Sequence, residues 1–366
     1  MTYIKQLDSI RAIAVIMVVF SHWTIIGSSS IFPWGSIGVT IFFVLSGFLI
    51  TNILLNKKKE IEDNSIKGIK VTAIAKFMMR RALRIFPLYY MILILLFFGT
   101  KILPNPIPKD WKYYALYVEN YLFYFKQAYP GGKLSPMWSL AVEEQFYLIW
   151  PWLIFFISKK NIKYVLGSGI IISIVSLVLL PLILEKKDFI NFLTPSCFDS
   201  FCWGGFLSFT FVYKKENLEN FSRLFRTLGL ISITLYVSLL CFDVSFDFIS
   251  RSLLSIFITW ILSIIIINKT GKLNTLFSNK ILMSIGKVSY GIYLLHNFIP
   301  TLVNTLFHWL VKKNYSFASF FNLNNLIESK NSLVSYLIYT LTLLIIAYSS
   351  YYLFEKPILK LKKYFE

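Results

Sequence analysis

The stretch that decides the fold class is "GSIGVTIFFVLSGFLITNILL", residues 35–55, which contains no charged side chain. A helix needs about 20 consecutive apolar residues to cross the hydrocarbon core of a bilayer. The whole chain has the same character, since 56% of its 366 residues are hydrophobic, 15% are charged and the mean hydropathy is +0.64. This composition is unlike that of soluble globular proteins. The sequence therefore predicts an all-helical integral membrane protein.

Charged residues and Pro/Gly clusters divide the chain into about ten apolar stretches of this kind. The predicted spans are residues 11–27, 35–55, 85–103, 138–157, 164–184, 196–213, 224–242, 248–267, 283–303 and 333–354. No long linker or low-complexity run separates them. Residues 1–366 are therefore predicted to form a single transmembrane domain, and we expect no appended extracytoplasmic domain.

Basic residues outnumber acidic ones, with 37 Lys and Arg against 18 Asp and Glu and a formal net charge of +19. In a soluble protein this excess would suggest a nucleic-acid partner, but in a membrane protein basic residues collect in cytoplasmic loops. The loop predicted at residues 56–84 is strongly basic, whereas the connection between the first two spans is uncharged. We therefore expect a multi-pass protein of the bacterial cytoplasmic membrane, with both termini in the cytoplasm and no nucleic-acid partner.

The first predicted span, "RAIAVIMVVFSHW", begins at Arg11 and carries His22 near its other end. Eleven steps of about 100° place both side chains on nearly one face, roughly 16 Å apart along the axis, with Asp8 close to that line. Arg11 could be an interfacial cation paired with Asp8, and His22 could be a hydrogen-bonded interhelical histidine. Because histidine titrates near neutral pH, the alternative for His22 is a general base.

A second group of charges lies in "RRALRIFP", at the predicted cytoplasmic end of the third span. Arg81 and Arg84 are three residues apart and share a helix face, while Arg80 points about 100° away from Arg81. Basic anchoring of a membrane helix would explain all three. Guanidinium groups also match the geometry of phosphate, so the functional alternative is recognition of a phosphorylated cytosolic molecule.

The segment "MWSLAVEEQFYLIWPW" opens the fourth predicted span with two adjacent carboxylates, Glu143 and Glu144. Ser139, Glu143 and Tyr147 recur at i, i+4 on one face. Ionisable residues inside spans usually face a cavity or each other, although a buried ion pair or a capping role would also explain them. Asp199 and His296 are further polar groups inside spans, and solvent at the outer boundary would account for Asp199.

The longest outer segment, residues 104–136, is rich in Trp and Tyr. Aromatic rings stack on sugar faces, but they also gather at membrane interfaces, so both readings stay open. Cys197, Cys202 and Cys241 show no metal-ligand spacing, and we expect neither a metal nor a permanently bound cofactor.

These segments together resemble the acyltransferase 3 family of membrane-bound acyltransferases, which includes bacterial O-antigen, peptidoglycan and exopolysaccharide O-acetylases. The resemblance rests on six pieces that occur in the family's order: "LDSIRAIAVIMVVFSH", "IGVTIFFVLSGFLIT", "RRALRIFPLYY", "MWSLAVEEQFYLIWP", "SYGIYLLH" and "FEKP". Each piece alone is weak, but the ordered set covers nearly the whole chain.

The resemblance implies a ten-helix core that transfers an acyl group, commonly acetyl from cytosolic acetyl-CoA, to a hydroxyl of an envelope glycan or lipid-linked saccharide. It also implies that His22 is catalytic with Arg11 as its partner, and that Arg81 and Arg84 handle the acyl donor, with Arg80 beside them. Many relatives carry an acidic residue where this chain has Thr40.

A carboxylate that supports His22 would then have to be Glu143, Glu144 or Asp199, and Asp8, Ser139 and His296 are predicted to support the site. Direct transfer and a covalent acyl-enzyme both remain open.

Two alternatives to an envelope O-acetyltransferase stand beside this prediction. Buried charges could line the path of a glycan or lipid-linked sugar transporter, although no internal repeat is visible in the sequence. The same fold could also transfer succinyl or acylate a small molecule. Homo-oligomers are compatible with every reading.

Overall fold

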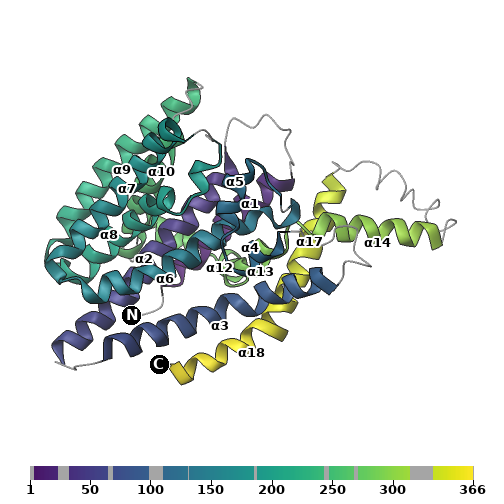
Figure 1. Cartoon of the computed structure of the whole chain (residues 1–366), viewed down its shortest axis with the longest axis horizontal. Coiled ribbons are helices and arrows are strands. Elements are labelled where there is room, and N and C mark those ends of the chain that lie inside the picture. The colour runs from purple at the N-terminus through teal and green to yellow at the C-terminus, as the bar shows by residue number, and fades with distance from the viewer. Residues whose placement is uncertain are drawn as a thin grey trace.

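The computed structural model describes residues 4–23, 33–64, 69–98, 110–130, 132–184, 188–242, 247–267, 271–313 and 333–365. Every regular element in these ranges is a helix (Figure 1), which confirms the predicted all-helical class. The main helices are α1 (Gln6–Trp23), α2 (Trp34–Asp63), α3 (Ile69–Phe98), α6 (Trp138–Phe156), α7 (Ile162–Ile183), α8 (Phe198–Tyr213), α9 (Leu218–Cys241), α10 (Asp247–Ile267) and α17 (Leu333–Ser350).

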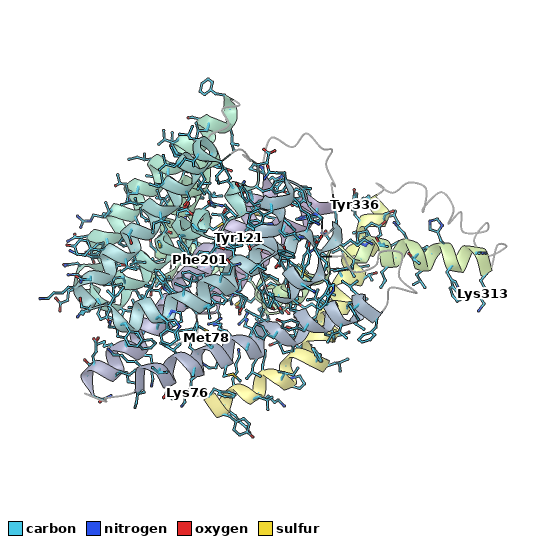
Figure 2. The ribbon with its side chains drawn as sticks, in the orientation of Figure 1. Lys76, Met78, Tyr121, Phe201, Lys313 and Tyr336 are labelled. Carbon is cyan, nitrogen blue, oxygen red and sulfur yellow. The ribbon has the colours of Figure 1, made fainter. Side chains whose placement is uncertain are left out.

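Shorter helices connect these elements. They are α4 (Trp111–Ala115), α5 (Glu119–Lys126), η2 (Gly132–Met137), η5 (Pro195–Cys197), α11 (Lys272–Phe277), α12 (Lys280–Lys287), α13 (Ser289–Leu295), α14 (Ile299–Lys313), α18 (Lys356–Leu359) and η8 (Lys360–Phe365). Helix α14 projects away from the other helices and ends at Lys313 (Figure 2).

Six helical segments in the described ranges are long and apolar enough to cross a membrane. They are Trp34–Asp63, Ile69–Phe98, Lys159–Ile183, Lys215–Cys241, Ile249–Ile267 and Leu333–Phe365. The chain is therefore a multi-pass membrane protein. The predicted total of about ten spans and the cytoplasmic position of both termini stay predictions.

The prediction of a loop over the whole of residues 56–84 is wrong, because α2 continues to Asp63 and α3 already begins at Ile69. Lys and Glu are good helix formers, and Lys57 pairs with Glu60 at 2.7 Å one turn apart. A helix of 30 residues is about 45 Å long, so each of these helices extends well beyond a hydrocarbon core of about 30 Å. The basic residues of this region therefore lie on helices.

The predicted span 283–303 is also wrong as a single helix, because the chain there forms α12, α13 and α14 in succession. A Cβ atom on Gly286 would lie 1.8 Å from the Asp8 carbonyl oxygen, so α12 is pressed against the start of α1. Pro300 occupies the second position of α14, where its fixed φ favours a new helix start. Backbone that leaves a helix at membrane depth is tolerated where it lines a cavity.

Helices α2 and α8 make a close contact through two glycines. A Cβ atom on Gly47 would come within 2.1 Å of the Phe201 carbonyl oxygen, and one on Gly204 would come within 2.1 Å of the Val44 carbonyl oxygen. Only glycine allows this approach, which is common between helices in membranes. Helix α2 therefore joins the α7–α10 group, grouped at the left of Figure 1, to the helices that surround the site.

Helix α6 is held at its end by a buried lysine of α2. The Lys58 ammonium donates to the carbonyl oxygens of Ile154, at 2.9 Å, and of Ile157. These carbonyls have no intrahelical partner at a helix C-terminus, so the cation satisfies them. The contact fixes α6 relative to α2, the two helices that carry Glu143 and Ser46.

Candidate active site

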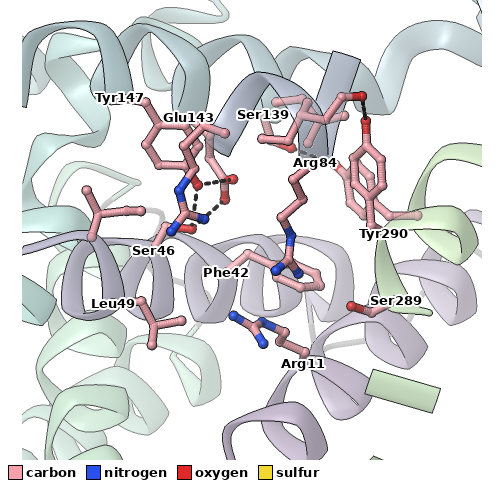
Figure 3. Close-up of a pocket in the computed structure, with 15 residues that line it drawn as sticks. Arg11, Phe42, Ser46, Leu49, Arg84, Ser139, Glu143, Tyr147, Ser289 and Tyr290 are labelled. Carbon is pink, nitrogen blue, oxygen red and sulfur yellow. Dashed lines mark hydrogen bonds between the residues drawn. The ribbon is translucent and has the colours of Figure 1, made fainter. Parts of the chain in front are cut away.

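A pocket with an empty volume of about 720 Å³ lies where α1, α2, α3, α6 and α13 meet (Figure 3). The structure brings five predicted site residues to this pocket, namely Arg11, Arg81, Arg84, Ser139 and Glu143. The rest of the wall consists of Phe42, Ser46, Leu49, Ile50, Ile85, Leu140, Tyr147, Ser289, Tyr290 and Tyr293. Three helices, α1, α3 and α6, thus place their predicted polar groups around one cavity.

Glu143 is held by hydroxyl donors from two helices. Ser46 of α2 donates to one carboxylate oxygen at 3.1 Å, and Tyr147, one turn further along α6, donates to the other at 2.8 Å. The i, i+4 spacing of Glu143 and Tyr147 predicted this proximity. The carboxylate is therefore fixed in orientation on the pocket wall.

The two pocket arginines of α3 differ in their surroundings. The Arg81 guanidinium lies over the rings of Phe77 and Tyr147, 5.5 and 5.7 Å from their centroids. For Arg84, no hydrogen bond or ion pair joins its guanidinium to any residue that the structure describes. An arginine that opens into a cavity without a protein partner is a candidate for binding an anionic ligand.

Arg11 forms the predicted ion pair with Asp8, at 2.8 Å between Nη1 and Oδ1. Its side chain also lines a second pocket of about 510 Å³ together with Asp8, Arg84, Gly286, Lys287, Tyr290, Tyr351, Glu355 and Leu359. Figure 3 shows Arg11 and Arg84 entering the first pocket from opposite sides, with their guanidinium groups facing one another. The Asp8–Arg11 pair therefore forms part of the site wall.

Ser139 and Tyr293 close the first pocket on another side. The Tyr293 hydroxyl donates its single proton to the Pro136 carbonyl oxygen at 2.7 Å. In the 2.7 Å contact between the two hydroxyls, Ser139 is then the donor. The Ser139 hydroxyl consequently offers a lone pair to the pocket, and its proton is already engaged.

His22 lies at the far end of α1, and its exposed ring is outside the wall of either pocket. Its Nδ1 atom is 2.8 Å from the Val18 carbonyl oxygen. Because a carbonyl only accepts hydrogen bonds, Nδ1 carries the proton and Nε2 keeps a lone pair. This tautomer is the one a general base needs, and here a backbone group sets it.

His296 packs against His22, with ring centroids 5.0 Å apart and planes at 67°. It is fully buried just after α13, and its Nδ1 donates to the Tyr293 carbonyl oxygen at 2.6 Å. Its Nε2 atom has no partner among the residues that the structure describes. The indole of Trp23 donates to the His296 carbonyl oxygen at 3.1 Å, which ties the two histidine segments together.

No carboxylate bonds to His22 in the part of the chain that the structure describes. Glu143 bonds to Ser46 and Tyr147 instead, and one Glu144 carboxylate oxygen is buried without a partner among the described residues. Thr40 donates to the Ser36 carbonyl oxygen within its own helix. Orientation of His22 thus comes from the Val18 carbonyl group.

Asp199 is buried, so solvent does not account for its charge, and it bonds to other residues than His22. It lies 3.5 Å from the Arg251 guanidinium and accepts a hydrogen bond of 2.6 Å from Ser252. Arg80 also differs from expectation, because it does not line either pocket and donates to the Phe365 carbonyl oxygen at 2.6 Å. The 100° offset between Arg80 and Arg81 is the reason for this separation.

Sequence reasoning missed several residues of the site. Tyr290, Tyr293 and Ser289 lie in "SYGIYLLH", and Glu355 lies in "FEKP", two segments whose sequence alone suggests no role for these side chains. Ser46, in the second predicted span, is another wall residue that the sequence did not single out. The only sequence feature that could have indicated these residues is a hydroxyl or carboxyl group inside an apolar segment.

The outer aromatic segment is only partly solvent-facing. Tyr114 and Tyr117 are buried, whereas Tyr113 and Tyr129 are exposed. Glu119 lies inside this segment, accepts from Tyr89 at 3.4 Å and is fully buried. Burial raises the pKa of the Glu119 carboxyl well above its ordinary value. Much of this segment is therefore protein core, and residues 104–109 and 131 lie outside the described ranges.

An acyltransferase domain profile matches residues 4–357. The peptidoglycan O-acetyltransferase OatA of Listeria monocytogenes is 32% identical over 331 residues, which cover 82% of this chain and 50% of that protein. The O-acetyltransferase OatA of Staphylococcus aureus is 26% identical over 331 residues, which cover 83% of this chain and 52% of that protein. The chain spans about half the length of these curated relatives. No solved structure matches it significantly.

Proposed function

The chain belongs to the acyltransferase 3 family, and from this premise we propose that it moves an acetyl group from cytosolic acetyl-CoA to a hydroxyl of an envelope carbohydrate. The names of the relatives support an O-acetyl product. Membership makes the protein an acyltransferase, so the transporter alternative is set aside. The same proposal includes a bacterial cytoplasmic membrane, about ten spans and cytoplasmic termini, which the distribution of Lys and Arg favours.

The observation that carries the choice of donor is the first pocket itself. Two arginines, Arg81 and Arg84, open into a cavity whose other walls include Phe42, Leu49 and Ile50. A small number of placed polar groups on a mostly apolar wall is typical of small-molecule sites. Acetyl-CoA combines phosphates, which suit guanidinium groups, with a long and largely uncharged arm that suits the apolar wall.

His22 supplies the base for the transfer. Its Nε2 lone pair takes the proton of the acceptor hydroxyl, and the oxygen attacks the thioester carbon. The new oxygen–carbon bond forms as the carbon–sulfur bond breaks, and the proton passes from His22 to the departing thiolate. His22 needs no metal for these steps, and His296 limits the movement of its ring through the 5.0 Å contact.

The acyl group has to travel between the pocket and His22. Tyr293 lines the pocket, and its ring centroid lies 5.9 Å from that of His296, which in turn contacts His22. The end of the donor arm therefore approaches His22 along this side of α13. A covalent acyl-enzyme is the alternative route, and it differs in leaving acetyl on the protein after CoA is removed.

The acceptor is proposed as an envelope glycan, with peptidoglycan favoured over O-antigen, capsule or exopolysaccharide by the name of the Listeria relative. A lipid-linked saccharide is the form in which such a glycan meets a membrane enzyme. The mass of the ester group distinguishes succinyl from acetyl transfer. The identity of the molecule that carries the ester distinguishes a small-molecule acceptor from a glycan.

The test is His22→Ala expressed in a strain that lacks its own copy, with ester-linked acetyl on envelope glycans measured by mass spectrometry. Loss of general-base catalysis is expected to lower acetylation by about 10²- to 10⁴-fold. His308→Ala is the matched control, since His308 is an exposed histidine of α14. Equal membrane levels of both variants show that folding is intact. Full acetylation with His22→Ala would show that His22 is not the general base.

A further inference from the structure

We propose that the two pockets divide the donor between them: the second pocket holds its phosphates on Arg84 and Lys287, and the first pocket receives only the acyl-pantetheine arm. The division rests on the proposed function, in which acetyl-CoA is the donor. It assigns Lys287 to substrate binding and separates Arg81 from Arg84, which the sequence pattern had grouped together.

The two pockets adjoin and differ in their walls. They share Arg11, Arg84 and Tyr290. The first pocket adds five aliphatic or phenyl side chains, whereas the second adds only Leu359 among such side chains. A ligand that is charged at one end and uncharged at the other matches this pair of chambers.

The cations of the second pocket are arranged for an anion. Lys287 is exposed, and no ion pair or hydrogen bond joins its ammonium to a residue within the described ranges. Arg84 likewise has no hydrogen bond or ion pair to a described residue, and its guanidinium faces that of Arg11 (Figure 3). Two like charges that face each other across a cavity repel one another, and a phosphate between them removes the repulsion.

The second pocket also contains two carboxylates, and Glu355 interacts electrostatically with Arg84. Asp8 is already paired with Arg11 at 2.8 Å. Glu355 accepts a hydrogen bond of 3.3 Å from Ser350 and keeps acceptor capacity toward the pocket. The hydroxyl and amino groups of a nucleoside are donors that suit such a carboxylate. The nucleoside end of the donor therefore has a partner in the same chamber as its phosphates.

Arg81 opens only into the first pocket, beside Tyr147 and Glu143. It is thus placed to donate to the carbonyl oxygens of the pantetheine arm or of the thioester. Arg80 contacts neither chamber. The three arginines of this part of α3 therefore have separate roles. Arg80 binds the C-terminal segment, Arg81 contacts the arm of the donor and Arg84 binds its phosphates.

The experiment compares two donors on the purified full-length enzyme: acetyl-CoA, and acetyl-pantetheine, which keeps the thioester and arm but has no phosphate. Lys287→Ala is expected to raise KM for acetyl-CoA about fivefold, the effect of one exposed charge contact of about 1 kcal/mol. KM for acetyl-pantetheine is expected to change by less than about twofold. Arg81→Ala is expected to impair both donors by a similar factor.

Lys280→Ala serves as the control, because Lys280 is an exposed lysine of the same helix outside both pockets. The division of the donor is refuted if Lys287→Ala raises KM for both donors by one factor, or leaves KM for acetyl-CoA at the parent value. A parent enzyme that transfers acetyl from neither donor would instead refute the proposed function, so the two failures are distinguishable.

Discussion

Two arginines in this bundle, Arg251 and Arg84, have very different surroundings. Arg251 of α10 is surrounded by acceptors: it contacts the Asp199 carboxylate at 3.5 Å, donates to the Asn191 carbonyl oxygen at 2.8 Å and also donates to the Ser196 carbonyl oxygen. Arg84 of α3 has no such partner within the described ranges and lines both pockets.

On the proposed function, the difference separates an arginine that stabilises the fold from one that binds the substrate. The Arg251 network joins α10 to η5 and the start of α8, and its groups are compensated by each other. A compensated network is costly to break, because removal of one partner leaves the other buried and unpaired. Arg84 has no hydrogen bond or ion pair of this kind within the described ranges, so its loss is expected to affect activity and to spare the fold.

The largest expected effect is on the fold, at Arg251. Arg251→Met leaves the Asp199 carboxylate buried without a cation and is expected to lower the free energy of unfolding by about 3–5 kcal/mol. Thermal unfolding in detergent micelles measures this change. In the same assay, Arg84→Met is expected to shift the melting temperature by no more than about 2 °C. Equal losses in both variants would abolish the distinction between the two sites.

The next effect is on activity, at Arg84. On the proposed function, Arg84 makes two charge-assisted hydrogen bonds to the donor, worth about 1.5 kcal/mol each, so Arg84→Met is expected to lower kcat/KM for acetyl-CoA by about 10²-fold. Initial rates of acetyl transfer at low donor concentration measure it. Arg80→Met is the neighbouring control, with an expected rate close to that of the parent. Parent-like kinetics in Arg84→Met would show that the pocket binds its donor by other groups.

The carboxylates Glu143 and Asp199 allow the same comparison, with a smaller expected effect on activity. Glu143→Gln alters the contacts with Ser46 and Tyr147 on the pocket wall and is expected to reduce kcat by about tenfold, at a cost of roughly 1.4 kcal/mol. Asp199→Asn is expected to lower stability and leave kcat of the folded fraction near the parent value. Measuring kcat and melting temperature for both variants distinguishes a role in activity from a role in stability. A loss of stability in Glu143→Gln and a loss of kcat in Asp199→Asn would contradict the assignment.

The smallest effect is expected at Glu119, a buried carboxyl without a cation. Its folded-state pKa is raised by burial, so charging it opposes folding, and stability falls as pH increases through that pKa. Glu119→Gln is expected to raise stability by about 0.5–1 kcal/mol at high pH and by nothing at pH 5. Melting temperatures of parent and variant between pH 5 and 9 test this. A difference that is constant with pH would show that the carboxyl does not titrate.

The sequence predicted helices well where they are continuous and apolar. Helix α6, predicted at residues 138–157, is observed at Trp138–Phe156. The break at residues 288–298 could not be predicted from hydropathy, which carries no information on the close approach of Gly286 to the Asp8 backbone, some 280 residues earlier in the chain. The loop prediction for the basic segment 56–84 is wrong because charge indicates exposure to water and says little about helix or loop.

The candidate site was predictable to the extent that its residues are ionisable. Arg11, Arg81, Arg84 and Glu143 stand out in apolar segments and do meet at one pocket. Ser46, Tyr290 and Tyr293 are ordinary hydroxyl residues in the sequence, and only tertiary packing places them on the wall. The orientation of His22 was beyond sequence reasoning, because the backbone of its own helix replaces the expected carboxylate.

The broken helix near the C-terminus also determines when this site can exist during biosynthesis. Helix α1 is synthesised early, but His22 contacts His296 and Arg11 shares a pocket with Tyr290, and both of these partners lie more than 270 residues later in the chain. Contacts so distant in the chain close slowly, and here they close last. A partly translated chain therefore carries the histidine and the arginine of α1 for most of translation without the pocket around Arg11, which is completed only when α13 has been made.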